Sequence, residues 1–144
     1  MSASENRISM DFSQKRLATL WFIGPGFLFF LLLLQTMRGV YGDKASEAWS
    51  WLLPTFMPTL LLIVGVLVNK ARLQNAQDVT VDRFMYFISF YLSIAYFIAV
   101  ILTFFLSQFS AQSPLTQLKL SNLYLTPIQG LVSLALGAFF VSQK

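Results

Sequence analysis

The sequence predicts an all-α integral membrane protein: a bundle of four transmembrane helices with N-in/C-in topology and no soluble domain. Hydrophobic residues make up 56% of the chain and charged residues only 11%, whereas a soluble chain usually has about 25% charged residues. Lipid offers the backbone no hydrogen-bond partners, which favours helices, and the apolar stretches lack the alternation of barrel strands. Charged residues are absent from four long stretches: 17–37, 48–69, 84–118 and 120–143.

Each uncharged stretch is long enough to hold one membrane-spanning helix. A bilayer core about 30 Å thick needs roughly 20 apolar residues of helix. We therefore divide the chain into a cytoplasmic N-terminal segment, 1–16, and a four-helix transmembrane domain, 17–144. The spans are expected at about 17–37, 51–68, 84–107 and 123–141, of which the fourth is the shortest.

Polar residues near the third and fourth spans predict where those helices begin. Asp78 or Thr80 could cap the third helix, because a short polar side chain there accepts a backbone hydrogen bond. Thr126 followed by Pro127 suits the start of the fourth, since proline is favoured in the first turn of a helix.

The basic residues divide unequally between the two sides of the predicted bundle. Seven lie on the side of the termini: Arg7, Lys15, Arg16, Lys70, Arg72, Arg83 and Lys144. Three lie on the other side: Arg38, Lys44 and Lys119. Cytoplasmic segments carry an excess of Lys and Arg, so this bias predicts that both termini are cytoplasmic, in a multi-pass protein of the cell membrane.

Missing residue types exclude several kinds of chemistry. The chain has no Cys and no His, which rules out disulfides, thiolate metal sites, imidazole ligands and Ser-His catalysis. The four spans also contain no carboxylate or amine that could act as an acid, a base or a proton carrier. We therefore expect no enzyme activity, no cofactor and no metal site.

Proline and glycine interrupt the pattern of the first two spans. Gly24, Pro25 and Gly26 lie inside the first span, where proline removes a backbone donor and glycine resists bending least. This motif predicts either a simple kink or, in the alternative, a hinge or a broken helix whose freed carbonyl groups line a pathway. Pro54 and Pro58 share one face of the second span, and Pro58 should bend that helix.

The third span carries hydroxyl groups every three or four residues. On a helix these positions fall on one face, which Val100 and Ser107 share. The face could be a packing seam between helices or the lining of a pore, and in either case it should avoid lipid. We name it the hydroxyl stripe: Tyr86, Ser89, Ser93, Tyr96 and Thr103.

Small residues follow one face of the fourth span. Ser133 and Gly137 form a small-x-x-x-small pattern, and Gly130 lies on the same face. Such patterns let helix backbones approach closely. They fit packing inside the bundle or contact between subunits, and the few partners within one short chain favour contact between subunits.

Two functional classes remain. The favoured one is a homo-oligomeric channel or pore with the hydroxyl stripe in its wall, because without a soluble domain the chain must act through its spans. The alternative is a non-catalytic accessory subunit that packs against another membrane protein. The expected partners are the lipid bilayer and either further copies of the chain or another membrane protein. The net charge of +4 belongs to residues beside the spans and does not indicate nucleic acid.

Overall fold

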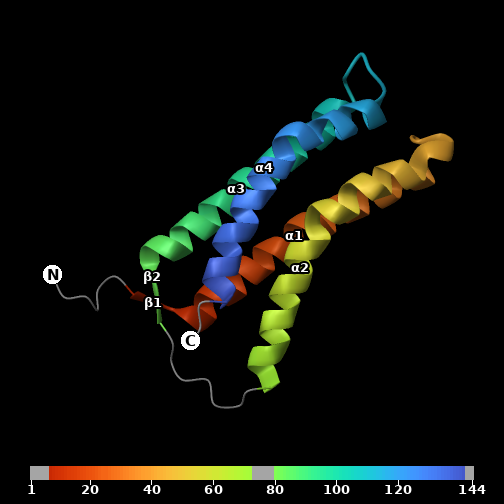
Figure 1. Cartoon of the computed structure of the whole chain (residues 1–144). Helices are drawn as coiled ribbons and strands as arrows, with labels where there is room; N and C mark the ends of the chain where they lie inside the picture. Colours follow the sequence, from red (N-terminus) through yellow and green to blue (C-terminus); the bar gives the residue numbers. More distant parts are fainter. Residues whose placement is uncertain (1–6, 73–79, 142–144) are drawn as a thin grey trace.

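The computed structural model describes residues 7–72 and 80–141, and these residues form four long helices (Figure 1). Each helix is long and apolar enough to cross a membrane, which confirms the predicted number of long apolar helices. The helices are α1 (Met10–Met37), α2 (Ala45–Arg72), α3 (Arg83–Ser107) and α4 (Pro114–Val141).

The helices pack in the cyclic order α1, α2, α4, α3. The pair α3 and α4 makes the most extensive contact, followed by α2 with α4, and α1 packs against both α2 and α3. Figure 1 shows α3 and α4 side by side, whereas α2 turns away from its neighbours toward its C-terminal end. α2 contains Pro54 and Pro58, and prolines inside a helix are an established cause of such bends.

Three of the helices extend beyond the apolar spans predicted for them. α1 begins at Met10, inside the segment predicted to precede it. The predicted start of the fourth span at Thr126 is wrong, because α4 begins at Pro114 and Pro127 lies inside it. Ser113 explains this start, since its Oγ accepts a hydrogen bond from the backbone N–H of Thr116 at 3.3 Å. Hydropathy marks the lipid-facing part of a helix, whereas caps and backbone bonds decide where the helix begins.

α3 is capped two to four residues later than predicted. Its cap is Asp82, whose Oδ1 accepts a hydrogen bond from the backbone N–H of Phe84 at 3.0 Å. Thr80 lies in a strand, and Asp78 lies outside the described residues.

Two short strands depart from the all-α prediction. β1 (Arg7–Ser9) pairs antiparallel with β2 (Thr80–Asp82), and Ile8 lies opposite Val81. This ribbon joins the start of α1 to the start of α3, so residues just before both helices satisfy one another's backbone groups.

The opposite end of the bundle holds the two short connections between helices. Gly39 and Gly42 adopt positive φ angles of 71° and 52°, a conformation that glycine tolerates best. They lie between α1 and α2, and a short 3₁₀ helix, η1 (Gly42–Lys44), begins at Gly42. An ion pair between Glu47 and Lys119 joins α2 to α4 at this end.

Candidate functional site

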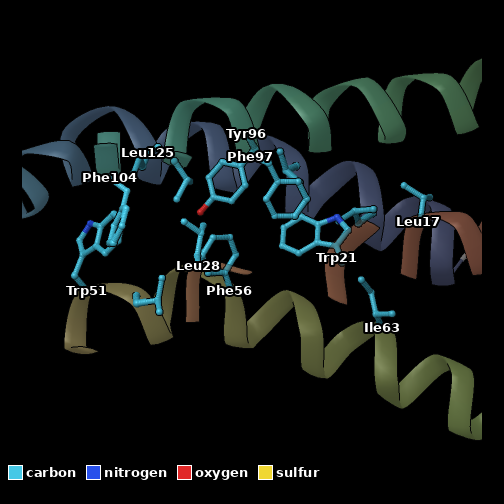
Figure 2. Close-up of a cluster of buried hydrophobic side chains, with 14 of the residues drawn as sticks. Leu17, Trp21, Leu28, Trp51, Phe56, Ile63, Tyr96, Phe97, Phe104 and Leu125 are labelled. Carbon is cyan, nitrogen blue, oxygen red and sulfur yellow. The ribbon is translucent and has the colours of Figure 1, made fainter. Parts of the chain in front are cut away.

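Four large aromatic side chains meet at the middle of the bundle (Figure 2). Trp21 of α1 stacks on Tyr96 of α3 at a centroid distance of 6.1 Å and meets Phe97 edge-on at 4.8 Å. Phe56 of α2 stacks on Phe97 at 5.9 Å. The exposed fraction of Trp21 and of Tyr96 is 0%. We call these four residues the aromatic centre, and it fills the space between α1, α2 and α3.

The hydroxyl stripe faces the interior of the bundle, and every one of its members is buried. Trp21 Nε1 donates to Ser93 Oγ at 3.0 Å, and Ser93 Oγ in turn donates to the backbone oxygen of Ser89 at 2.7 Å. Ser89 Oγ donates to the backbone oxygen of Ala135 at 3.4 Å. These bonds join α3 to α1 and to α4.

The remaining stripe residues connect α3 to α2 and again to α4. Tyr96 OH donates to the backbone oxygen of Thr55 at 3.2 Å, and the hydroxyls of Thr103 and Tyr124 lie 2.6 Å apart. Tyr86 OH is buried and has no hydrogen-bond partner among the described residues. The stripe therefore bonds α3 to each of the other three helices, which places it at a helix interface inside a single chain.

Sequence reasoning missed Gln129, whose side chain donates hydrogen bonds to backbone oxygens in the proline-rich part of α2. Pro58 has no N–H, so the backbone oxygen of Pro54, one turn earlier, lacks its usual partner. Gln129 Nε2 of α4 donates to the backbone oxygen of Thr55 at 2.7 Å and to that of Pro54 at 3.3 Å. An amide inside an apolar span was the available signal, because a polar side chain at membrane depth needs a partner.

We expect Gln129→Met to lower the free energy of unfolding by about 1 kcal/mol. It leaves the backbone oxygen of Pro54 without a donor, whereas the backbone oxygen of Thr55 keeps the hydroxyl of Tyr96. Pro58→Ala returns an N–H to the backbone oxygen of Pro54, so the loss on Gln129→Met should shrink in that background. A double-mutant cycle, followed by unfolding in mixed micelles, measures this coupling. Gln117→Met, the same change earlier on α4, is the control. An equal loss with and without Pro58 would show that Gln129 does not compensate for the proline.

The Gly24-Pro25-Gly26 motif does not break the first helix. α1 continues from Met10 to Met37, and Pro25 is buried within it. A Cβ atom on Gly24 would lie 3.0 Å from the ring of Phe97, whereas a Cβ on Gly26 would meet no atom within 4 Å. The motif thus brings α1 against the aromatic centre at Gly24 and leaves open space at Gly26. Its role as a hinge stays a prediction.

Gly24→Ala and Gly26→Ala should change stability in opposite directions. Alanine at position 24 must displace Phe97, which Trp21 and Phe56 hold in place, so we expect a loss of about 1–2 kcal/mol. Alanine at position 26 meets no neighbour and should raise stability by up to about 1 kcal/mol through its higher helix propensity. Unfolding of the two variants in mixed micelles tests this pair, and equal effects would contradict the close approach at Gly24.

The small residues of α4 do not mediate a close contact within the chain. Gly130 is exposed, and Ser133 and Gly137 are half-buried. A Cβ atom on Gly130 or Gly137 would meet no atom within 4 Å. The described residues thus show no tight packing at either glycine, and contact between subunits stays a prediction.

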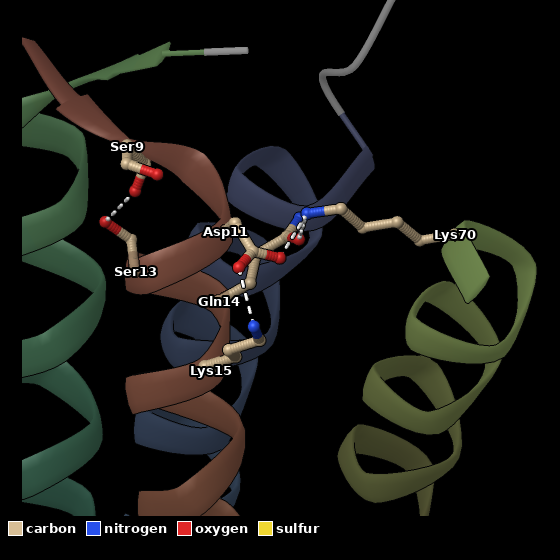
Figure 3. Close-up of polar contacts among 6 residues, drawn as sticks. All are labelled: Ser9, Asp11, Ser13, Gln14, Lys15 and Lys70. Atoms are coloured by element: carbon tan, nitrogen blue, oxygen red, sulfur yellow. Dashed lines mark hydrogen bonds and ion pairs between the residues drawn. The ribbon is translucent and has the colours of Figure 1, made fainter. Parts of the chain in front are cut away.

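A polar cluster ties α2 to α1 at the end of the bundle that holds β1 and β2 (Figure 3). Lys70 Nζ lies 3.0 Å from Asp11 Oδ1 and donates to Gln14 Oε1 at 3.2 Å. Lys15 Nζ lies 2.7 Å from Asp11 Oδ2. The side chain of Gln14 is buried, so Lys70 supplies a partner for a polar group that solvent does not reach.

The site holds helices together through aromatic contacts and hydrogen bonds. In residues 7–72 and 80–141, no group of three or more His, Cys, Asp or Glu side chains is placed to hold a metal ion. Four long apolar helices, with charged residues at their ends, are the features of a polytopic α-helical membrane protein. Comparison with family models, curated proteins and solved structures finds no match to this chain.

Proposed function

We propose that this protein is a non-catalytic accessory subunit that packs against another membrane protein. One observation supports this proposal above all: the hydroxyl stripe is buried inside a single chain and bonded to α1, α2 and α4. The outward faces of the helices carry large apolar side chains instead, such as Leu131 and Leu134 of α4. A chain of this kind acts through the shape of its lipid-facing surface, where small residues permit close helix contact.

The face of α4 that holds Gly130 and Gly137 is the surface we propose for that contact. Space is open at both glycines, so another helix could approach the backbone of α4 closely. Neither position is needed to pack the bundle itself. Substituting them should therefore affect association more than folding.

A homo-oligomeric channel or pore is the second candidate, because the open face of α4 fits another copy of the chain equally well. The sequence pattern favours a pore whose wall contains the hydroxyl stripe. The stripe lies inside the bundle, so the pore wall would have to be formed by other residues. The pore would then run between subunits and along outward faces. This candidate predicts a symmetric ring that conducts.

We further propose that both termini lie in the cytoplasm and that the protein belongs to the cell membrane. The start of α1 and the end of α2 lie at the same end of the bundle (Figure 1). Among the described residues that end carries six basic residues, against three at the other, and cytoplasmic segments are richer in Lys and Arg. Reporter fusions at each terminus test the topology, and a reporter active outside the cell at either end would contradict it.

The mass of the complex purified in mild detergent, combined with a flux assay in vesicles, separates the two candidates. The accessory subunit predicts a complex of fixed stoichiometry with a second, different polypeptide and no ion flux from the purified chain alone. Gly137→Leu should dissociate that complex, whereas Gly65→Leu, at an open position of α2, should leave it intact. A symmetric ring of identical chains that conducts ions would favour the pore and overturn the accessory role.

A further inference from the structure

We propose that a groove between α1 and α2 binds the acyl chain of a membrane lipid near the middle of the bilayer. The groove lies on the outer side of the contact between the two helices and has a volume of about 210 Å³. We call it the α1–α2 groove, and its lining is Phe22, Pro25, Gly26, Phe29, Leu52, Leu53, Phe56, Met57 and Leu60.

The depth of the groove places it among lipid tails. α1 and α2 have 28 residues each, and a helix of that length is about 42 Å long at 1.5 Å per residue. It thus exceeds the hydrocarbon core of about 30 Å at both ends. The lining comes from residues 22–29 of α1 and 52–60 of α2, in the central part of each helix. Acyl chains are the membrane component that surrounds a protein at this depth.

The chemistry of the lining suits a hydrocarbon chain. Every lining residue is apolar. The hydroxyl-bearing residues of this part of α2, Thr55 and Thr59, are buried and absent from the lining. A headgroup or another polar ligand would lose its hydrogen bonds to water without replacement, whereas an acyl chain has none to lose.

The shape of the groove favours a thin chain over a helix. Gly26 leaves its floor open, because a Cβ there would meet no atom within 4 Å. Phe22 and Phe29, which are 48% and 47% exposed, stand on either side of it on the same face. The two rings are seven positions apart in the sequence, or about 10.5 Å along the helix axis. A helix with its side chains is about 10–12 Å across, so a second helix would have to displace these rings. The volume also falls below the roughly 300 Å³ at which sites for whole ligands begin.

The test uses vesicles of phosphatidylcholine in which one acyl chain carries a photoreactive diazirine near its end. After illumination, mass spectrometry of the protein should find labelled lipid on Phe29, Leu53 or Met57, above the labelling of Leu134, a freely exposed residue of α4. Gly26→Phe fills the groove and should reduce this labelling about tenfold, which corresponds to about 1.4 kcal/mol of binding free energy. Gly65→Phe, at an open position outside the lining, is the matched control and should leave it unchanged.

Unfolding in mixed micelles establishes that both variants keep the fold. Met57→Phe narrows the groove from the α2 side. It should therefore also reduce the lipid labelling, independently of Gly26→Phe. Three results would overturn the proposal: labelling no higher than at Leu134, labelling insensitive to Gly26→Phe and Met57→Phe in folded protein, or protein-to-protein cross-links through the lining that show a second chain in the groove.

Discussion

Replacement of Trp21 by Ala should lower the free energy of unfolding by about 3 kcal/mol. Trp21 is fully buried and contacts Phe56, Tyr96 and Phe97. Its indole N–H also donates to Ser93. The side chain leaves water before the helices associate, so the loss comes from the cavity and the lost contacts and not from transfer out of water.

Reversible unfolding by SDS in mixed micelles measures this loss. The control is Phe30→Ala on the same helix, because Phe30 is 56% exposed and faces away from the bundle. Trp21→Phe should give an intermediate loss, since it keeps an aromatic ring and removes the hydrogen bond. If Trp21→Ala and Phe30→Ala were equally stable, the aromatic centre would not support the fold.

Ser93→Leu should lower the free energy of unfolding by about 2–6 kcal/mol through two effects that add. The larger side chain has no room at a fully buried position, and overpacking typically costs about 1–3 kcal/mol. It also removes the acceptor of the Trp21 N–H, and a buried donor without a partner costs about 1–3 kcal/mol. Ser89→Leu should act in the same direction, because Ser89 is also fully buried.

Ala95→Leu is the matched control for this series. It adds a comparable side chain two residues away on α3, where the surface is exposed. Ser93→Ala separates the two effects, because it removes the hydroxyl without adding bulk. Leu92→Ala and Ile88→Ala, on other faces of α3, should be milder than Ser93→Leu. Equal tolerance of leucine at positions 93 and 95 would show that the stripe does not face the interior.

Sequence patterns predicted the helices more accurately than their ends. Uncharged stretches located the centre of all four helices, because lipid demands both apolar side chains and a self-bonded backbone. The true ends depend on single hydrogen bonds, such as those of Asp82 and Ser113. Such bonds lie in polar segments where hydropathy gives no signal, which explains why Thr126 was a wrong start.

The candidate site was predicted in part. The spacing of hydroxyls on α3 identified a face that avoids lipid, because polar groups at that depth need partners. It could not identify the partners, since Trp21, Thr55 and Ala135 lie far away in the sequence. Packing seam and pore lining therefore both stayed compatible with the pattern.

The sequence by itself determined that the chain forms four apolar helices and that one face of α3 is polar. These features follow from composition and from the 3.6-residue period, which are local properties. Only the tertiary structure decided which helices are neighbours and that the stripe is turned inward. It also decided that Gln129 donates hydrogen bonds to backbone oxygens of α2 near Pro58. In the same way, it decided that Gly24 lies against Phe97 and that Gly26 leaves a groove open. Those outcomes depend on how side chains from distant segments fill shared space, and the periodicity of a single helix carries no information about that.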